Sequence, residues 1–317
     1  MTRQPNFNGP LAAAMGDFIT YKRMQGYTYR TQTDSLKLFD RFLTRQDCPD
    51  GVLQGDVFRR YQASIAELSP GTQEGYLSVV RVFSQYLQGL HPETAVMPAN
   101  IEPCHPRRVR FYRIDPEQIR ELMDATPVLR MQHPIAPQTV RFLIGLLYST
   151  GLRISEALKL NLGDVDLPCG TLYVRRGKFA KDRLVSMTPS ATEALGDWLD
   201  LRSRHAPTAL SAPLLPGGKD GRLTYAQSHI AFRTLCCRCG LHGDPPPRLH
   251  DLRHNFACRC IARWREAGEN VQALLPVLAN AMGHVSISST QFYVHLDAAE
   301  LQPASNKFNN YFNKNKE

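Results

Sequence analysis

The segment 149–156 reads STGLRISE and places an arginine and a glutamate closely behind a glycine. The apolar residues before it recur at the spacing of a helix, and Gly151 predicts the end of that helix. Arg153 then begins a further helix predicted over 152–162, where unpaired backbone N–H groups attract anions. A guanidinium at such a position can bind a phosphate, although Arg153 and Glu156 are also spaced to form a structural ion pair.

A second segment, 250–254, reads HDLRH and opens a predicted helix after a run of three prolines. His250 and Arg253 are three residues apart, so they share a helix face and could bind one phosphate together. His250 and His254 also mimic the H-E-x-x-H helix of zinc hydrolases. Asp251 is shorter than the glutamate of that motif, and an arginine on the helix would repel a metal ion. We therefore expect no zinc at this segment.

Two further signals lie near the C-terminal end of the chain. Gly283 closes a predicted helix and is followed at once by His284. Tyr293 comes nine residues after His284, on a short apolar helix predicted over 288–294. A single tyrosine on such a helix is more typical of a hydrophobic core than of a nucleophile.

Two lysines lie in the turn of a predicted β-hairpin. Its strands are predicted over 171–176 and 183–188, and the turn 177–182 holds Lys178 and Lys181. A lysine in such a turn is usually solvated, but it can also lean into a neighbouring groove.

The length of 317 residues, with 43% hydrophobic residues, predicts two domains with hydrophobic cores. Residues 11–90 are predicted to form a helical bundle, residues 91–114 a basic linker with several prolines and arginines, and residues 115–317 a second domain with a C-terminal tail. The predicted helices are 11–24, 31–44, 57–68, 70–87, 116–126, 139–150, 152–162, 190–203, 225–239, 250–267, 271–282 and 288–294. The fold class is therefore mainly α, with one small antiparallel sheet in the second domain.

The net charge indicates the class of partner, and the hydropathy pattern indicates the compartment. Lys and Arg number 38 against 29 for Asp and Glu, and the net charge of +9 favours a polyanion such as nucleic acid. The start, 1–10, is polar and predicts no export signal. The longest apolar stretch, 142–152, is interrupted and too short to span a bilayer. We therefore expect a cytoplasmic protein without a membrane partner.

Eight cysteines are expected to be reduced thiols in that compartment. Cys236, Cys237 and Cys239, with His242 close behind, suggest zinc at first sight. Structural zinc sites favour wider spacing, and two cysteines in a C-x-C pair on a helix point to different faces. We expect buried or half-buried thiols here and no metal.

Taken together, the motifs resemble the signatures of the tyrosine recombinases, the phage-integrase-like family of site-specific DNA recombinases. By motif the resemblance covers residues 115–296, and the joint match over roughly 140 residues is far more specific than any single part. The N-terminal bundle resembles the helical, SAM-like core-binding domain of this family, and the second domain its catalytic fold. The catalytic residues that the resemblance implies are Arg153, Lys178, His250, Arg253, His284 and Tyr293, with Lys181 as the alternative lysine.

The resemblance also implies a mechanism. Tyr293 would attack a phosphodiester of double-stranded DNA to give a 3′-phosphotyrosine, and the two arginines would bind the scissile phosphate. His284 would add a hydrogen bond to the phosphate, and His250 would accept a proton or bind the phosphate. The hairpin lysine would protonate the leaving 5′-oxygen. Glu156 is expected to orient the site, and no metal, ATP or other cofactor is expected.

The family further implies a homotetramer in a synaptic complex, and a C-terminal segment exchanged between protomers. The apolar residues of the tail fit such docking, although packing on its own domain is the alternative. Two other functions also stay open. A type IB topoisomerase-like enzyme would use the same residues for DNA relaxation, and a DNA-binding protein without catalysis would not need the complete set.

Overall fold

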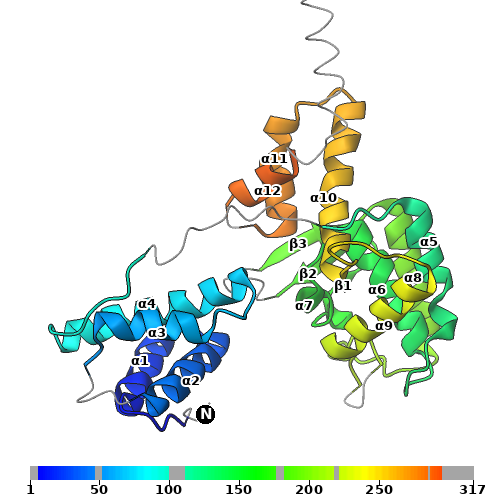
Figure 1. Cartoon of the computed structure of the whole chain (residues 1–317). Coiled ribbons are helices and arrows are strands. Elements are labelled where there is room, and N and C mark those ends of the chain that lie inside the picture. The colour runs from blue at the N-terminus through cyan, green and yellow to red at the C-terminus, as the bar shows by residue number, and fades with distance from the viewer. Residues whose placement is uncertain are drawn as a thin grey trace, which may run out of the picture. The chain divides into compact units, whose positions relative to one another are not determined.

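The computed structural model describes residues 6–46, 52–99, 111–175, 182–217, 221–284 and 286–294. The chain divides into two compact units, Met1–Arg108 and Val109–Glu317 (Figure 1). Each unit encloses a hydrophobic core of its own. Within the described ranges, no helix combines the length and the apolar character needed to span a bilayer.

The first unit is a helical bundle, as the apolar spacing predicted. Its helices are α1 (Ala12–Met24), α2 (Arg30–Arg45), α3 (Gly55–Ser64) and α4 (Pro70–Leu90). At the centre, Phe18 is fully buried and meets the rings of Tyr29 and Phe83 at centroid distances of 5.6 and 5.4 Å. Leu36 and Phe39 of α2 are buried in the same cluster. Each helix thus directs an apolar face inward, which is what the helical spacing of these residues requires.

The two ends of the predicted linker 91–114 contact different units: the N-terminal end contacts the first unit, and the C-terminal end contacts the second. Arg81 of α4 donates hydrogen bonds to the carbonyls of Pro98 and Ala99, at 3.1 and 2.9 Å. In the second unit, the amide of Ile114 donates to Oδ1 of Asn255 at 3.1 Å. Residues 100–110, between these ends, lie outside the described part of the chain.

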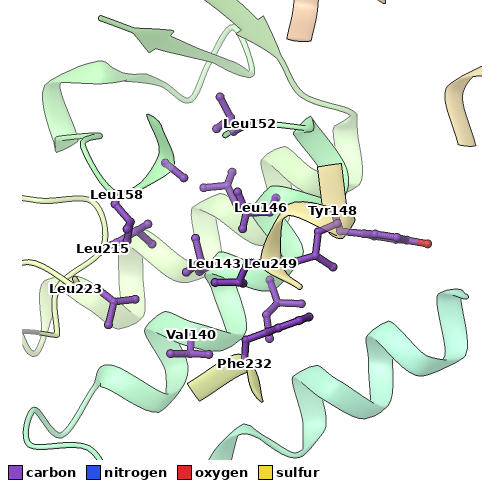
Figure 2. Close-up of a cluster of buried hydrophobic side chains, with 14 of the residues drawn as sticks. Val140, Leu143, Leu146, Tyr148, Leu152, Leu158, Leu215, Leu223, Phe232 and Leu249 are labelled. Atoms are coloured by element: carbon purple, nitrogen blue, oxygen red, sulfur yellow. The ribbon is translucent and has the colours of Figure 1, made fainter. Parts of the chain in front are cut away.

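The second unit is mostly helical and is built around one central helix. Its helices are α5 (Pro116–Asp124), α6 (Ala136–Thr150), α7 (Ile154–Ala157), α8 (Pro189–Ser203), α9 (Tyr225–Arg238), α10 (Leu249–Glu266), α11 (Val271–Met282) and α12 (Ser288–Val294), with 3-10 turns η2 (Thr126–Val128) and η3 (Leu162–Asp164). The central helix is α6, which packs against α5, α8, α9 and α10. Figure 2 shows Val140, Leu143 and Leu146 of α6 in one cluster with Phe232 of α9 and Leu249 of α10.

A small antiparallel sheet confirms the predicted sheet type. It consists of β1 (Val165–Asp166), β2 (Thr171–Val174) and β3 (Arg183–Ser186), paired in the order β1-β2-β3. Thr171 pairs with Ser186 and Val174 pairs with Arg183. The sequence did not reveal β1, because two residues are too few to show an alternating pattern. Residues 176–181, with both candidate lysines, Lys178 and Lys181, lie outside the described residues.

The helix predicted over 152–162 is wrong in its length. Only the short α7 forms there, and the chain then passes to η3. Leu158 and Leu160 are both buried, so they enter the core at a spacing of two residues that a helix does not provide. Arg222 donates to the carbonyls of Leu158 and Leu160, at 2.6 and 3.0 Å. The carbonyl of Leu160 also accepts from the amide of Leu214 at 2.9 Å. Both carbonyls therefore have partners outside a helix, and a longer helix is not needed to satisfy them.

Helices α10, α11 and α12 pack on one another at one end of the second unit (Figure 1). They enclose a separate small core of Ala257, Ile261, Leu275, Leu278, Met282 and Tyr293. The predicted bounds of α11 and α12 are confirmed, and glycine ends α11 as expected, with Gly283 at a φ of +66°.

Gly151 gives a test of how tightly α6 meets α10. It ends α6 at a φ of +64°, and a Cβ at this position would overlap the ring of Phe256. Gly268 has a similar φ of +72°, but a Cβ there would have nothing within 4 Å. We expect Gly268→Ala to lower the free energy of unfolding by about 1–2 kcal/mol through backbone strain alone. Gly151→Ala should lose about 1–3 kcal/mol more through overpacking.

Urea unfolding of both variants measures this difference. Equal losses for the two substitutions would contradict the close contact between the end of α6 and Phe256.

Candidate active site

Arg253 lies on the second turn of α10 and is buried, with 2% of its surface exposed. Its Nη1 donates to the carbonyl of Gly151 at 2.6 Å, and its Nη2 donates to the carbonyl of Met282 at 2.7 Å. One side chain therefore ties the end of α6 and the end of α11 to α10. Burial, and then the charge of Arg153, lowers the pKa of Arg253 to about 10. The guanidinium stays charged at neutral pH.

Arg153 precedes α7 and is held in place by two partners. Its Nη1 donates to Oε1 of Glu156 at 2.8 Å, and its Nη2 donates to the carbonyl of Gly283 at 2.8 Å. Its backbone amide donates to Oε2 of Glu156 at 3.0 Å. The ion pair that the sequence allowed between Arg153 and Glu156 therefore forms. Arg153 also bonds to the C-terminal end of α11, as Arg253 does.

A third arginine, Arg183, completes this cluster, and none of the sequence motifs includes it. From the start of β3, its Nη1 and Nη2 donate to the two carboxylate oxygens of Glu156, at 3.0 and 2.8 Å. Its Nε donates to the carbonyl of Ala281 at 3.0 Å. No local spacing marks Arg183, because its partners come from α7 and α11. The only hint in the sequence is a cation at the first position of a predicted strand.

Glu156 is the anion that balances these arginines. Its side chain is only 5% exposed. Burial raises the pKa of its carboxyl group, but hydrogen bonds from Arg183 and from the backbone of Arg153 outweigh this and lower the pKa to about 2. Glu156 is therefore ionised, and it holds Arg153 and Arg183 in a fixed geometry.

Tyr293 of α12 is buried, with 4% of its surface exposed, and packs in the small core of α10, α11 and α12. Its hydroxyl forms a hydrogen bond with Nδ1 of His254 at 2.8 Å. Burial raises the pKa of the phenol, while the charges of Arg253 and Arg153 lower it, and the net value is about 12. The phenol is thus neutral and lies within the electrostatic field of both arginines.

His284 lies beside Tyr293, and His250 lies beside His254. Nδ1 of His284 forms a hydrogen bond with the hydroxyl of Thr290 at 2.8 Å, and its ring lies nearly parallel to that of Tyr293 at a centroid distance of 6.4 Å. His250 is exposed and meets the ring of His254 edge-on, at 4.7 Å between centroids. The surrounding protein shields part of the His250 ring from water, which disfavours the charged form and lowers the pKa of His250. The charge of Arg253 lowers this pKa further.

The structure therefore brings together five of the six residues predicted from the sequence: Arg153, His250, Arg253, His284 and Tyr293. The sixth, Lys178, and its alternative Lys181 lie outside the described residues.

His254 is part of this region, although its motif in the sequence suggested no role for it other than that of a zinc ligand. Its ring contacts those of Phe111 and Tyr293, at centroid distances of 5.1 and 5.6 Å. Burial, and then the neighbouring His250, lowers the pKa of His254 to about 4, so its ring is neutral at pH 7. The helical spacing of the sequence could have indicated that His254 is buried, since it shares a face of α10 with the buried Ala257 and Ile261.

The cysteines and histidines do not gather into a metal site in the described residues, where no three His, Cys, Asp or Glu side chains are placed to hold an ion. The six described cysteines form no disulfide. Cys236 is buried and Cys237 is exposed, so these neighbours on α9 face different surroundings.

The ionised state of Glu156 predicts a pH effect on stability. Its folded pKa of about 2 is depressed from 4.5, so its stabilising contribution is present above pH 4.5 and is lost as the pH falls toward 2. At pH 7, Glu156→Gln should lower the free energy of unfolding by about 3 kcal/mol relative to the unsubstituted protein. The difference should shrink between pH 5 and pH 2, as measured by urea unfolding. A difference that is the same at pH 7 and pH 3 would contradict this role.

Comparisons with known proteins show the family to which the chain belongs. The phage integrase family matches residues 112–300. The chain is 35% identical over 289 residues to y4rB, named as an integrase/recombinase of Sinorhizobium fredii, across 89% of this chain and 91% of that protein. It is 33% identical over 294 residues to the tyrosine recombinase XerC of Actinobacillus succinogenes, across 90% of this chain and 92% of that protein.

Solved structures share the fold. The XerH site-specific recombinase bound to a palindromic difH substrate gives a TM-score of 0.67 at 21% identity, covering 87% of this chain and 78% of XerH. The Tn1549 transposon integrase in complex with a circular intermediate DNA also gives 0.67, at 18% identity, covering 92% of this chain and 98% of that one. Sequence and fold thus confirm the resemblance that the motifs indicated: the chain belongs to the phage integrase family and is a tyrosine recombinase.

Proposed function

We propose that this recombinase cuts and rejoins DNA strands with Tyr293 as the nucleophile and a 3′-phosphotyrosine as the intermediate. The observation that carries the proposal is the position of Tyr293, which packs in one small core with Met282, the residue whose carbonyl holds Arg253. The Tyr293 ring also lies beside that of His284. The names of the relatives point the same way, since XerC is a tyrosine recombinase, and the XerH and Tn1549 integrase structures contain DNA.

In this proposal Arg153 and Arg253 bind the scissile phosphate. Attack on phosphorus builds negative charge on the non-bridging oxygens, and fixed guanidinium donors stabilise that charge. The hydrogen bonds of Arg253 to Gly151 and Met282 use one N–H on each terminal nitrogen. A guanidinium has five N–H groups, so the bonds that anchor Arg253 leave donors for a phosphate. The same holds for Arg153, which Glu156 and the carbonyl of Gly283 anchor.

The remaining site residues supply hydrogen bonds and proton transfer. His284, beside the Tyr293 ring, donates to the phosphate, and the exposed His250 binds the phosphate or takes up a proton. The 5′-alkoxide is a poor leaving group, so it needs a proton as the P–O bond breaks. A lysine in the connection between β2 and β3 supplies it, and Lys178 or Lys181 fills this role in our proposal.

Double-stranded DNA is the partner in this proposal, and the excess of positive charge favours its binding. Strand exchange requires active protomers on two duplexes, so we propose a tetramer in the synaptic complex. The phosphotyrosine bond retains the energy of the phosphodiester. The proposed reaction therefore needs neither ATP nor a metal ion.

A nicked suicide substrate tests the nucleophile, because the short 5′-strand diffuses away and leaves the adduct trapped. We expect the unsubstituted protein to form a covalent protein–DNA adduct, visible as a shifted band on a denaturing gel. Tyr293→Phe should bind DNA and form no adduct. Arg253→Ala should form the adduct at least about 100-fold more slowly, as expected for the loss of one transition-state donor. Arg120→Ala, which removes an exposed arginine on α5, is the control and should keep the normal rate.

A persistent adduct in Tyr293→Phe would overturn the assignment of the nucleophile.

A second labelled duplex tests the type of reaction. A recombinase joins strands of the two duplexes, whereas a topoisomerase-like enzyme reseals only the strand that it has cut. We expect joint products that form equally well with and without EDTA. Relaxation of supercoiled DNA without joint products would favour the topoisomerase alternative, and inhibition by EDTA would contradict a metal-free reaction.

A further inference from the structure

The hydrogen-bond partner of the Tyr293 hydroxyl is His254, a residue to which neither the motifs nor the proposed function assigns a role. Nδ1 of His254 lies 2.8 Å from the hydroxyl oxygen. Both residues are buried, with 8% and 4% of their surfaces exposed. The contact joins α10 to α12 inside the core, where the neighbouring side chains fix both rings.

The phenol needs a proton acceptor if it is to attack phosphorus. Its pKa of about 12 leaves almost no phenolate at neutral pH. A general base helps only from within hydrogen-bond reach of the proton that it removes. The histidine that the family resemblance implied as proton acceptor, His250, is exposed on the first turn of α10, and its ring meets His254 edge-on. The hydrogen bond to the phenol belongs to His254.

We infer that His254 accepts the proton of Tyr293 as the phenol attacks the scissile phosphate, an inference that rests on the proposed function. The proton passes from the Tyr293 oxygen to Nδ1 of His254 while that oxygen forms its bond to phosphorus. The bond from phosphorus to the 5′-oxygen breaks, and the 5′-oxygen takes a proton from the general acid. The products are the phosphotyrosine, a 5′-hydroxyl and a protonated His254, and the reverse reaction returns the same proton to Tyr293.

The surroundings of His254 fit a base that is neutral before the reaction. Burial and the charges of His250, Arg248 and Arg253 disfavour its protonated form, while Asp251 favours it. A bound phosphate places a negative charge against Arg253, which weakens the repulsion between Arg253 and a protonated His254. The bond that forms to phosphorus makes the phenol proton strongly acidic, so the transfer accompanies the attack and does not precede it.

Substitutions at one position separate proton transfer from the hydrogen bond. In His254→Ala both are lost. In His254→Asn the amide oxygen can still accept a hydrogen bond from the phenol, but an amide is too weak a base to take the proton. We expect both variants to form the covalent adduct on the suicide substrate about 100- to 1,000-fold more slowly, with DNA binding unchanged. His242→Ala, which removes an exposed histidine, is the matched control and should keep the normal rate.

Two further measurements exclude a purely structural effect. Added imidazole should restore part of the rate in His254→Ala, because it can enter the space that the side chain leaves and act as the base. A substrate with sulfur in place of the scissile 5′-oxygen has a leaving group that needs no proton. It should not rescue His254→Ala, since this variant lacks the base and retains the acid.

The outcomes are distinct. A normal rate in His254→Asn, or full rescue by the sulfur substrate, overturns the assignment of His254 as the base. If His254→Ala does not fold, as judged by circular dichroism, His254→Asn and His254→Gln carry the test. If the unsubstituted protein forms no adduct at all, the proposed function fails and the inference fails with it. If the unsubstituted protein forms the adduct and every His254 variant matches its rate, only the inference fails.

Discussion

Three arginines from three different elements bond to three successive carbonyls at the C-terminal end of α11. Arg183 of β3 bonds to the carbonyl of Ala281, Arg253 of α10 to Met282, and Arg153, just before α7, to Gly283. The last carbonyls of a helix lack partners within it and carry the negative end of the helix dipole. They therefore bind cations that would otherwise repel one another. This helix end is the constraint on which the cationic site depends.

Gly283 makes that helix end possible, for two physical reasons. Its φ of +66° turns the chain out of α11, a conformation that few other residues adopt easily. A Cβ at this position would also come within 2.8 Å of the Arg183 guanidinium. The buried carboxylate of Glu156 then offsets part of the positive charge and fixes the guanidinium planes. The helix α12, which carries Tyr293, follows soon after Gly283 in the chain. The turn at Gly283 therefore helps to position both Tyr293 and the arginines that bond to the end of α11.

The sequence predicted the parts of this site that local patterns encode. The bounds of α11 and α12 follow from apolar spacing and from the glycine that ends α11. The residues it did not predict depend on contacts between distant segments. Arg183 has the pattern of an ordinary strand residue, and its partners lie 27 and 98 positions away. His254 meets Tyr293 across 39 positions, so no spacing rule could pair them. The predicted length of α7 was wrong for the same reason. Arg222, more than 60 positions away, donates to carbonyls that a longer helix would otherwise have satisfied.

An anchored guanidinium also has a kinetic consequence for a site that must bind and release DNA. An arginine at the surface would lose side-chain entropy each time it bound a phosphate. Arg253 is already fixed by Gly151 and Met282, and that ordering is part of the folding of the domain. In the proposed reaction its remaining donors are ordered before the phosphate binds, which is the condition under which fixed dipoles lower a reaction barrier most. The hydrogen bonds that fold the end of α11 onto α6 and α10 thus also order the side chains that the proposed reaction uses.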